Sequence, residues 1–121
     1  MKIIVPMSGY GKRFQRAGYK TPKPLIEVED KPIISHVIDI FGKDNDFVFI
    51  CNEDHLNKTN MEEILNKYAP NKVILPIKPH KKGPVFAVSK AYKLIENDEP
   101  VIVNYCDFSC YWNFINFKDW L

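Results

Sequence analysis

Four short apolar runs divide the chain, at residues 2–6, 46–51, 72–76 and 100–105. Each is only about five to six residues long and rich in valine, isoleucine and aromatic side chains, as expected for strands buried on both faces of a sheet. The residues between them recur at helical spacing. This pattern predicts a helix from Pro32 to Gly42, whose apolar face contains Ile33, Ile34, Val37, Ile38 and Phe41.

Three more helices are predicted further along the chain. Asn60 and Glu63 fit a capping box at the start of one of them. Pro84 opens the next, and 111–121 contains the beginning of the last. The apolar face of the helix after Pro84 would be formed by Val85, Val88, Tyr92 and Ile95.

Strands and helices therefore alternate, which predicts an α/β three-layer fold with a mostly parallel sheet and right-handed crossovers. Ligands of such sheets bind beyond the carboxyl ends of the strands. The segments 7–23, 77–84 and 106–109 all follow predicted strands, so we expect them to meet at one edge of the sheet. Within the first, residues 7–20 should form a loop, and Pro22 and Pro24 should keep the next stretch extended.

Composition indicates one globular domain, since 45% of the 121 residues are hydrophobic. No apolar stretch approaches the roughly 20 residues that a membrane span requires. Residues 1–6 do not resemble a secretory signal, so we expect a cytoplasmic protein with no membrane partner. The three cysteines, Cys51, Cys106 and Cys110, form no C-x-x-C pair and are expected to be buried, reduced thiols.

The net charge of +2 conceals a local positive segment. Residues 1–26 hold no acid, whereas all 15 acids lie later in the chain. Such a cluster suits a small polyanion, for example a nucleoside triphosphate or a sugar phosphate, better than a nucleic acid. The cations of this segment are Lys2, Lys12, Arg13, Arg16, Lys20 and Lys23.

The histidines carry weaker signals. His80 stands in a second basic patch with Lys78, Lys81 and Lys82, which either holds phosphate or forms a solvated loop. His36 and His55 have no ligand-like neighbours in the sequence and are expected to be solvated.

Gly9 and Gly11 follow the first predicted strand closely, where glycine lets the backbone approach a phosphate. A P-loop is excluded, because Pro6 and Arg13 stand where it requires glycine and serine or threonine. A dinucleotide fingerprint is excluded by Phe14. An ordinary tight turn also fits two glycines, but the clustered cations favour a phosphate site.

With GYGKR followed by TPKPL and then KPI ahead of a helix, the sequence resembles the nucleotidyltransferases, the sugar-nucleotide pyrophosphorylases and related cytidylyltransferases. It is most similar to the branch found with capsule and surface-polysaccharide genes. It departs from the family pattern at Met7, Ser8, Lys12 and Pro84. The matching residues are Gly9, Gly11, Arg13, Pro22, Lys23, Pro24, Leu25, Lys31, Pro32, Gly83 and Asp107.

The resemblance implies a Rossmann-like fold and a role for several residues. Arg13 and Lys23 would be catalytic, contacting the phosphates, and Asp107 would hold Mg²⁺. From the residues alone, the alternatives are a pairing with a surface acid for Arg13, a solvated side chain for Lys23 and a helix N-cap for Asp107. The nucleotide-binding set would be Met7, Ser8, Gly9, Gly11, Arg13, Lys23 and Gly83.

The implied reaction transfers a nucleoside monophosphate from a triphosphate to a sugar phosphate or similar small phosphorylated acceptor, with release of pyrophosphate, for polysaccharide biosynthesis. The resemblance favours CTP among CTP, UTP, dTTP and GTP. Because family members are longer, residues 1–121 would be a truncated, N-terminal nucleotide-binding part without the acceptor-binding part. The alternative is a non-catalytic module that binds triphosphate and Mg²⁺. An unpaired strand edge and the aromatic tail predict self-association into a homo-oligomer.

Overall fold

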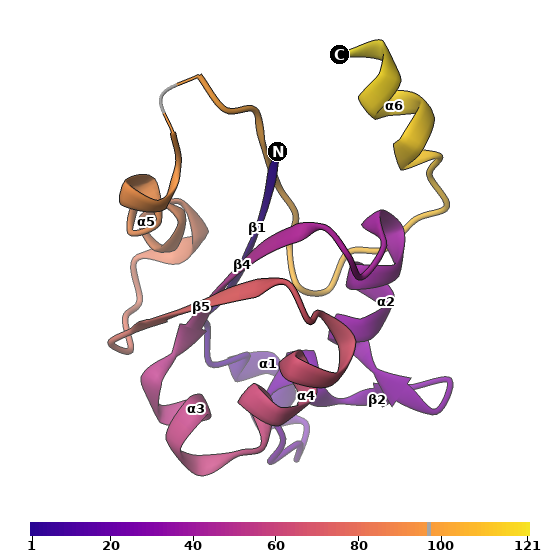
Figure 1. Ribbon diagram of the computed structural model, residues 1–121. Helices are drawn as coiled ribbons and strands as arrows, with labels where there is room; N and C mark the ends of the chain where they lie inside the picture. The colour runs from indigo at the N-terminus through magenta and orange to yellow at the C-terminus, as the bar shows by residue number, and fades with distance from the viewer. Residues whose placement is uncertain (97) are drawn as a thin grey trace.

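A sheet of four parallel strands forms the centre of the computed structural model, which describes residues 1–96 and 98–121 (Figure 1). Its strands lie in the order β5-β4-β1-β6, so the predicted parallel α/β fold is confirmed. Their bounds are Lys2–Met7 for β1, Asp46–Asn52 for β4, Lys72–Ile77 for β5 and Val101–Val103 for β6.

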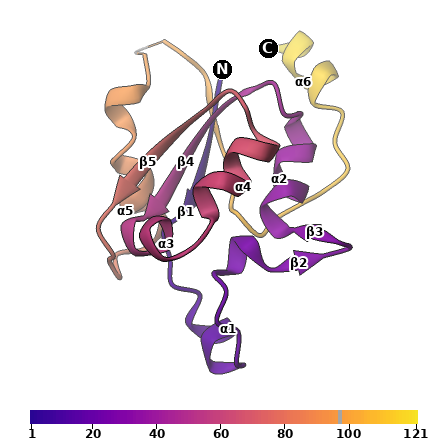
Figure 2. The same ribbon diagram turned by 60° about the horizontal axis from the view of Figure 1, so that its bottom comes forward.

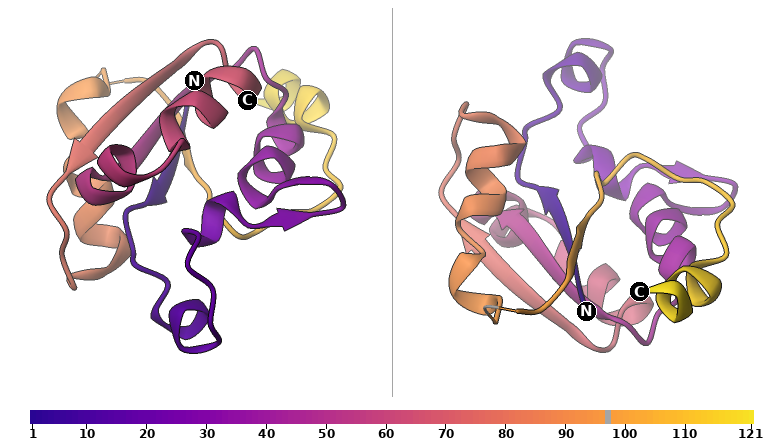
Figure 3. Two further views of the ribbon diagram at one scale, coloured as in Figure 1. Left: turned by 90° about the horizontal axis from the view of Figure 1, so that it is seen from below. Right: turned by 90° about the horizontal axis from the view of Figure 1, so that it is seen from above.

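The chain winds outward from β1 in both directions. It first adds β4 and then β5 on one side of β1, and afterwards crosses over to place β6 on the other side. Helices α2 (Ile33–Phe41) and α4 (Met61–Tyr68) lie on one face of the sheet, and α5 (Gly83–Ser89) lies on the opposite face (Figure 3). The winding reverses between β1 and β6, which is where open α/β sheets form their ligand crevice.

The buried strand β1 separates two apolar cores, because successive side chains of a strand point to opposite faces. Ile3 and Val5 belong to the larger core with residues of α2 and α4. Ile4 belongs to the smaller core, where it packs with Ala87 and Ala91.

The expected apolar face of the segment after Pro84 is partly correct, because Val88 and Ile95 pack against the smaller core, whereas Val85 and Tyr92 do not. The helix ends at Ser89 and is followed by a 3-10 turn, η2 (Tyr92–Leu94). Val85 is 82% exposed and Tyr92 67% exposed, whereas Ala87 and Ala91 are buried. The two alanines let this short segment lie close to the sheet, and Val85 and Tyr92 point outward.

The segment between β1 and α2 contains more regular structure than expected. Residues 12–16 form helix α1 (Lys12–Arg16), and the proline-flanked stretch forms a 3-10 turn, η1 (Lys23–Leu25), instead of an extended segment. Gly11 makes α1 possible, because its positive φ of 62° turns the chain so that its carbonyl accepts from Gln15 N at 3.1 Å. Figure 2 shows α1 projecting from the rest of the molecule. A hairpin of β2 (Glu27–Val28) and β3 (Lys31–Pro32) then leads into α2.

The capping prediction for α4 is correct for the position of the N-cap, Asn60, and wrong for its side-chain bond. Among the described residues Asn60 makes no side-chain capping bond, and Thr59 Oγ1 instead accepts from Met61 N at 3.3 Å. An additional helix, α3 (Glu53–Lys58), precedes it, and Asn52 caps this helix by accepting from Asp54 N at 2.8 Å.

The last strand and the tail differ in length from the prediction. Strand β6 ends at Val103, because Asn104 Nδ2 donates to the carbonyls of Tyr105 and Phe108, at 2.8 and 3.2 Å, and folds the chain into a turn. The final helix, α6 (Phe114–Trp120), begins later than expected and buries Phe114 against Phe41 of α2, with ring centroids 5.1 Å apart. No helix within the two described ranges is both long enough and apolar enough to cross a membrane. Self-association stays a prediction.

The cysteines are free thiols in three different environments. Cys51 is buried and Cys106 half-buried, and burial raises the pKa of these thiols to about 12 and about 11. Cys110 is exposed, so the expectation of a buried thiol is wrong at this position. His36 is half-buried, and its Nε2 lies 2.7 Å from Val28 O in an exposed hydrogen bond.

Candidate nucleotide-binding site

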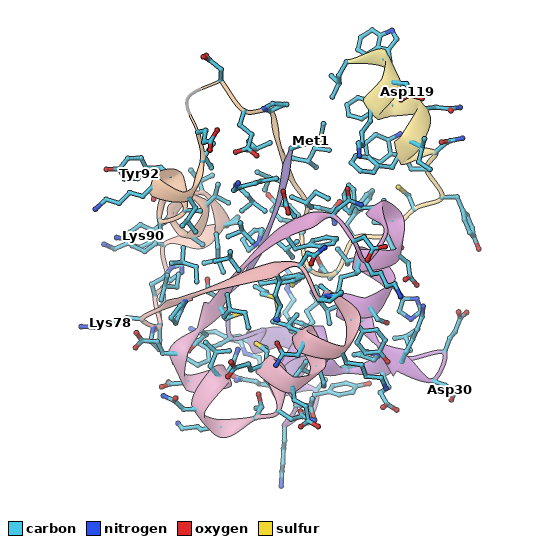
Figure 4. The ribbon with its side chains drawn as sticks, in the orientation of Figure 1. Met1, Asp30, Lys78, Lys90, Tyr92 and Asp119 are labelled. Carbon is cyan, nitrogen blue, oxygen red and sulfur yellow. The ribbon has the colours of Figure 1, made fainter. Side chains whose placement is uncertain are left out.

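A pocket of about 610 Å³ lies at the carboxyl edge of the sheet, and its walls come from the segments that the sequence singled out. Met1 marks the opposite, amino edge in Figure 4. The strand ends of β1, β5 and β6 bring together stretches that are far apart in the sequence, as expected. The lining residues from these segments are Met7, Ser8, Gly9, Tyr10, Gly11, Lys12, His80, Lys81, Gly83, Pro84, Cys106 and Asp107, with Lys23 and Pro24 of η1.

The glycine turn after β1 is held in place from the neighbouring strand β4. Asn52 Nδ2 donates to Ser8 O at 3.2 Å, and Tyr10 OH donates to Asp54 Oδ2 at 2.9 Å. The bond to Asp54 raises the pKa of Tyr10 above its ordinary value of 10.0. Gly11 is needed for its left-handed backbone, although a Cβ there would meet Lys23 Cβ only at an ordinary 3.5 Å.

The two hydrogen bonds that Asn52 and Asp54 make to the glycine turn were not predicted from the sequence. Asn52 and Asp54 are polar residues that directly follow a buried strand, and that position was the available signal. His55, expected to be solvated in a loop, is instead buried in α3. Its ring stands edge-on to Tyr10, with centroids 5.7 Å apart, and burial lowers its pKa below the ordinary 6.5.

Lys23 and Asp107 meet inside the pocket, with Nζ and Oδ2 separated by 2.5 Å. Pro24, buried beside Lys23, fixes the backbone of η1, and Asp107 follows β6. The helix N-cap alternative for Asp107 is wrong, because Asn113 caps α6 by accepting from Asn116 N at 3.0 Å. The residues expected to bind phosphate and metal are therefore in direct contact.

Asp107 is the one carboxylate among the described residues that line the pocket. The described chain also contains no group of three or more potential metal-ligating side chains. A single carboxylate suits Mg²⁺, which proteins commonly hold with one or two carboxylates together with substrate phosphates. The donor set thus fits a magnesium ion that arrives with a triphosphate.

Arg13 lies outside this group of residues. It is exposed on α1, and its neighbour Lys12 lines the pocket instead. The salt bridges found among the described residues do not include Arg13, so the alternative of pairing with a surface acid finds no support there. Its catalytic role stays a prediction.

The segment between β5 and α5 closes the other side of the pocket. Gly83 has a positive φ of 83°, and no atom lies within 4 Å of the place that a Cβ would occupy. His80 Nε2 lies 3.0 Å from Ser8 Oγ, and Lys81 also lines the pocket. Lys78, which directly follows β5, points away from the molecule in Figure 4. The basic patch therefore divides between the pocket and the solvent.

The site is thus that of a doubly wound α/β domain with a lysine-lined pocket at its switch point. No protein-family profile matches the sequence. A curated relative, 2-C-methyl-D-erythritol 4-phosphate cytidylyltransferase of Halalkalibacterium halodurans, is 34% identical over 73 residues, which are 58% of this chain and 30% of the relative.

Solved structures of nucleotide-transferring enzymes share the fold of this chain. The nucleoside-diphosphate-sugar pyrophosphorylase from Vibrio cholerae RC9 matches with a TM-score of 0.72 and 20% identity, over 97% of this chain and 52% of that one. The inositol-1-phosphate CTP transferase from T. maritima matches with a TM-score of 0.68 and 18% identity, over 88% and 43%. The resemblance to nucleotidyltransferases is confirmed, and the chain spans about half the length of these structures.

Proposed function

We propose that this chain is the nucleotide-binding part of an enzyme that transfers a nucleoside monophosphate from a triphosphate to a small phosphorylated acceptor. The observation that carries the proposal is the convergence of the glycine turn, Lys23 and Asp107 on one pocket, with Lys23 Nζ 2.5 Å from Asp107 Oδ2. Phosphates need donors and cations, and a magnesium ion needs a carboxylate, so this pocket offers both kinds of group.

In the proposed reaction, a phosphate oxygen of the acceptor attacks the α-phosphorus of the triphosphate. The bond from that phosphorus to the bridging oxygen breaks, and pyrophosphate leaves. Lys23 would hold the triphosphate, and Arg13 would stabilise the leaving pyrophosphate from α1. Bound Mg²⁺ would neutralise phosphate charge beside Asp107.

The donor and the acceptor are proposed from the relatives. The curated relative is named a cytidylyltransferase and the T. maritima protein a CTP transferase, which favours CTP as donor. Other neighbours are a UDP-glucose pyrophosphorylase and a UTP-bound enzyme, so UTP is the main competitor. We propose a sugar phosphate as acceptor and polysaccharide biosynthesis as the use of the product. The cytoplasmic location stays a prediction.

Calorimetric titration of CTP, UTP, dTTP and GTP with Mg²⁺ tests this function. We expect one base to bind in preference, and Lys23→Ala to weaken it by about 10–100-fold, as for the loss of a charged hydrogen bond. Arg16→Ala is the matched control, since Arg16 is an exposed cation of α1 that does not line the pocket. No binding of any triphosphate by the folded protein would contradict the proposal.

A second candidate is a module that binds triphosphate and Mg²⁺ without turnover. Pyrophosphate release in the presence of phosphorylated acceptors separates the two candidates. In an active sample, Arg13→Ala or Lys23→Ala should lower turnover by about 10²–10³-fold.

A further inference from the structure

One hydrogen bond joins two loops from opposite sides of the pocket. Ser8 follows β1 and His80 follows β5, and these strands are separated in the sheet by β4. Ser8 Oγ and His80 Nε2 nevertheless lie 3.0 Å apart, and both residues line the pocket. The bond therefore fixes the glycine turn relative to the segment that leads into Gly83.

The second ring nitrogen of His80 determines which atom donates in this bond. Lys82 N lies 3.1 Å from His80 Nδ1, and a backbone N–H can only donate. Nδ1 must accept, so the proton of the neutral ring is on Nε2 and is donated to Ser8 Oγ. The ring of Phe86 packs against the His80 ring in a tilted arrangement, with centroids 4.7 Å apart.

The Ser8 hydroxyl consequently keeps its own proton for another acceptor. Its side chain is almost fully buried, at 3% exposure, and no hydrogen bond among the described residues uses that proton. The pocket around it contains the cations Lys12, Lys23 and Lys81. An acceptor that suits these surroundings is an anionic oxygen.

We propose that Ser8 and His80 form a hydrogen-bond relay that directs the Ser8 hydroxyl at a phosphate oxygen of the bound triphosphate. Ser8 is then a binding residue, and His80 is a positioning residue that fixes the Ser8 oxygen without touching the ligand. This inference rests on the proposed function for the identity of the ligand. The relay itself exists in the nucleotide-free protein and can be measured there.

Long-range ¹⁵N–¹H NMR of the free protein at neutral pH tests the relay directly. We expect His80 in the Nε2–H tautomer, and we expect Ser8→Ala to change the Nε2 signal. His36 serves as an internal reference, since it lies outside the pocket. An Nδ1–H tautomer, or a ring that averages like a free imidazole, overturns the relay whether or not nucleotide binds.

Affinity measurements test the role in binding. Ser8→Ala should weaken the triphosphate complex by about 10–100-fold but leave the nucleoside complex unchanged, because the lost bond goes to a charged oxygen. His80→Ala should weaken the triphosphate complex as well, and Ser8→Ala with His80→Ala should be no weaker than Ser8→Ala alone. His80→Gln, whose amide can still donate to Ser8, should restore part of the affinity.

The outcomes separate this inference from the proposed function. If the unmodified chain binds no triphosphate, the proposed function fails and the NMR result alone decides the relay. If it binds, additive losses in the double variant overturn the relay. An equal loss of nucleoside affinity overturns the assignment to phosphate. Unchanged thermal midpoints in Ser8→Ala and His80→Gln show that the variants are folded.

Discussion

Replacing Asp107 by asparagine should change nucleotide affinity in opposite directions with and without Mg²⁺. In the nucleotide-free protein the carboxylate is paired with Lys23, at 2.5 Å between Nζ and Oδ2. Asparagine keeps the shape of the side chain and removes its charge. Without metal, a triphosphate no longer competes with the Asp107 carboxylate for Lys23. With metal, the carboxylate ligand is missing.

The structure sets the size of both effects. The side chains of Lys23 and Asp107 are 28% and 41% exposed, so solvent screens their attraction. A pair this accessible is worth about 0.2–1 kcal/mol. Affinity without metal should therefore rise by about 1.4–5-fold. With Mg²⁺ it should fall by about 10–100-fold, because an interaction with a charged group is lost.

Calorimetry with the preferred triphosphate, in chelator and in excess Mg²⁺, measures both limits. Asp39→Asn is the matched control, since it removes one negative charge and one exposed pairing with a lysine, Lys31, outside the pocket. It should leave both affinities within twofold, roughly the limit for a distant surface charge. A shift of equal sign and size in both conditions, or the same shift in Asp39→Asn, would refute the roles assigned to Lys23 and Asp107.

Three further predictions concern stability and reactivity. Burial lowers the pKa of His55 in the folded protein, so the neutral ring contributes fully to the free energy of unfolding above the ordinary pKa of 6.5, and this contribution is lost as the pH falls through the folded value. Urea unfolding at about pH 7.5 and about pH 5.5 should show the loss of stability, and His55→Gln should make it smaller. Ellman's reagent should modify Cys110 rapidly and leave the buried Cys51 unmodified in the folded protein, and a fast phase that persists in Cys110→Ser would contradict this. Gly11→Ala should destabilise by about 1–2 kcal/mol because of its positive φ. Gly9→Ala, at an open position without positive φ, should cost less than about 0.5 kcal/mol in the same thermal unfolding experiment.

Local patterns predicted the regular part of this protein well. Strands β1, β4 and β5 match their apolar runs to within one residue, and α2 ends at Gly42 as expected. These elements are buried, so their composition is dictated by the core and is visible in the sequence. The errors fall where single side-chain bonds decide the backbone. Asn52 capping α3 and Asn104 ending β6 are examples, because such bonds leave no periodic signal.

For the candidate site, the segments that carry the chemistry could be predicted from the order of strands and helices. Apolar runs in alternation with helices require a parallel sheet, and a parallel sheet gathers the residues that follow its strands at one edge. The meeting of the glycine turn, Lys23 and Asp107 was therefore predictable.

The contacts between individual side chains, by contrast, depend on the folded chain as a whole. The tertiary structure paired Lys23 with Asp107, joined Ser8 to His80, and left Arg13 exposed beside the pocket. It also buried His55 beside Tyr10. Contacts of this kind depend on the register of the strands and on the direction in which each loop leaves the sheet. Both are set by packing across the whole core, and no local pattern in the sequence records them.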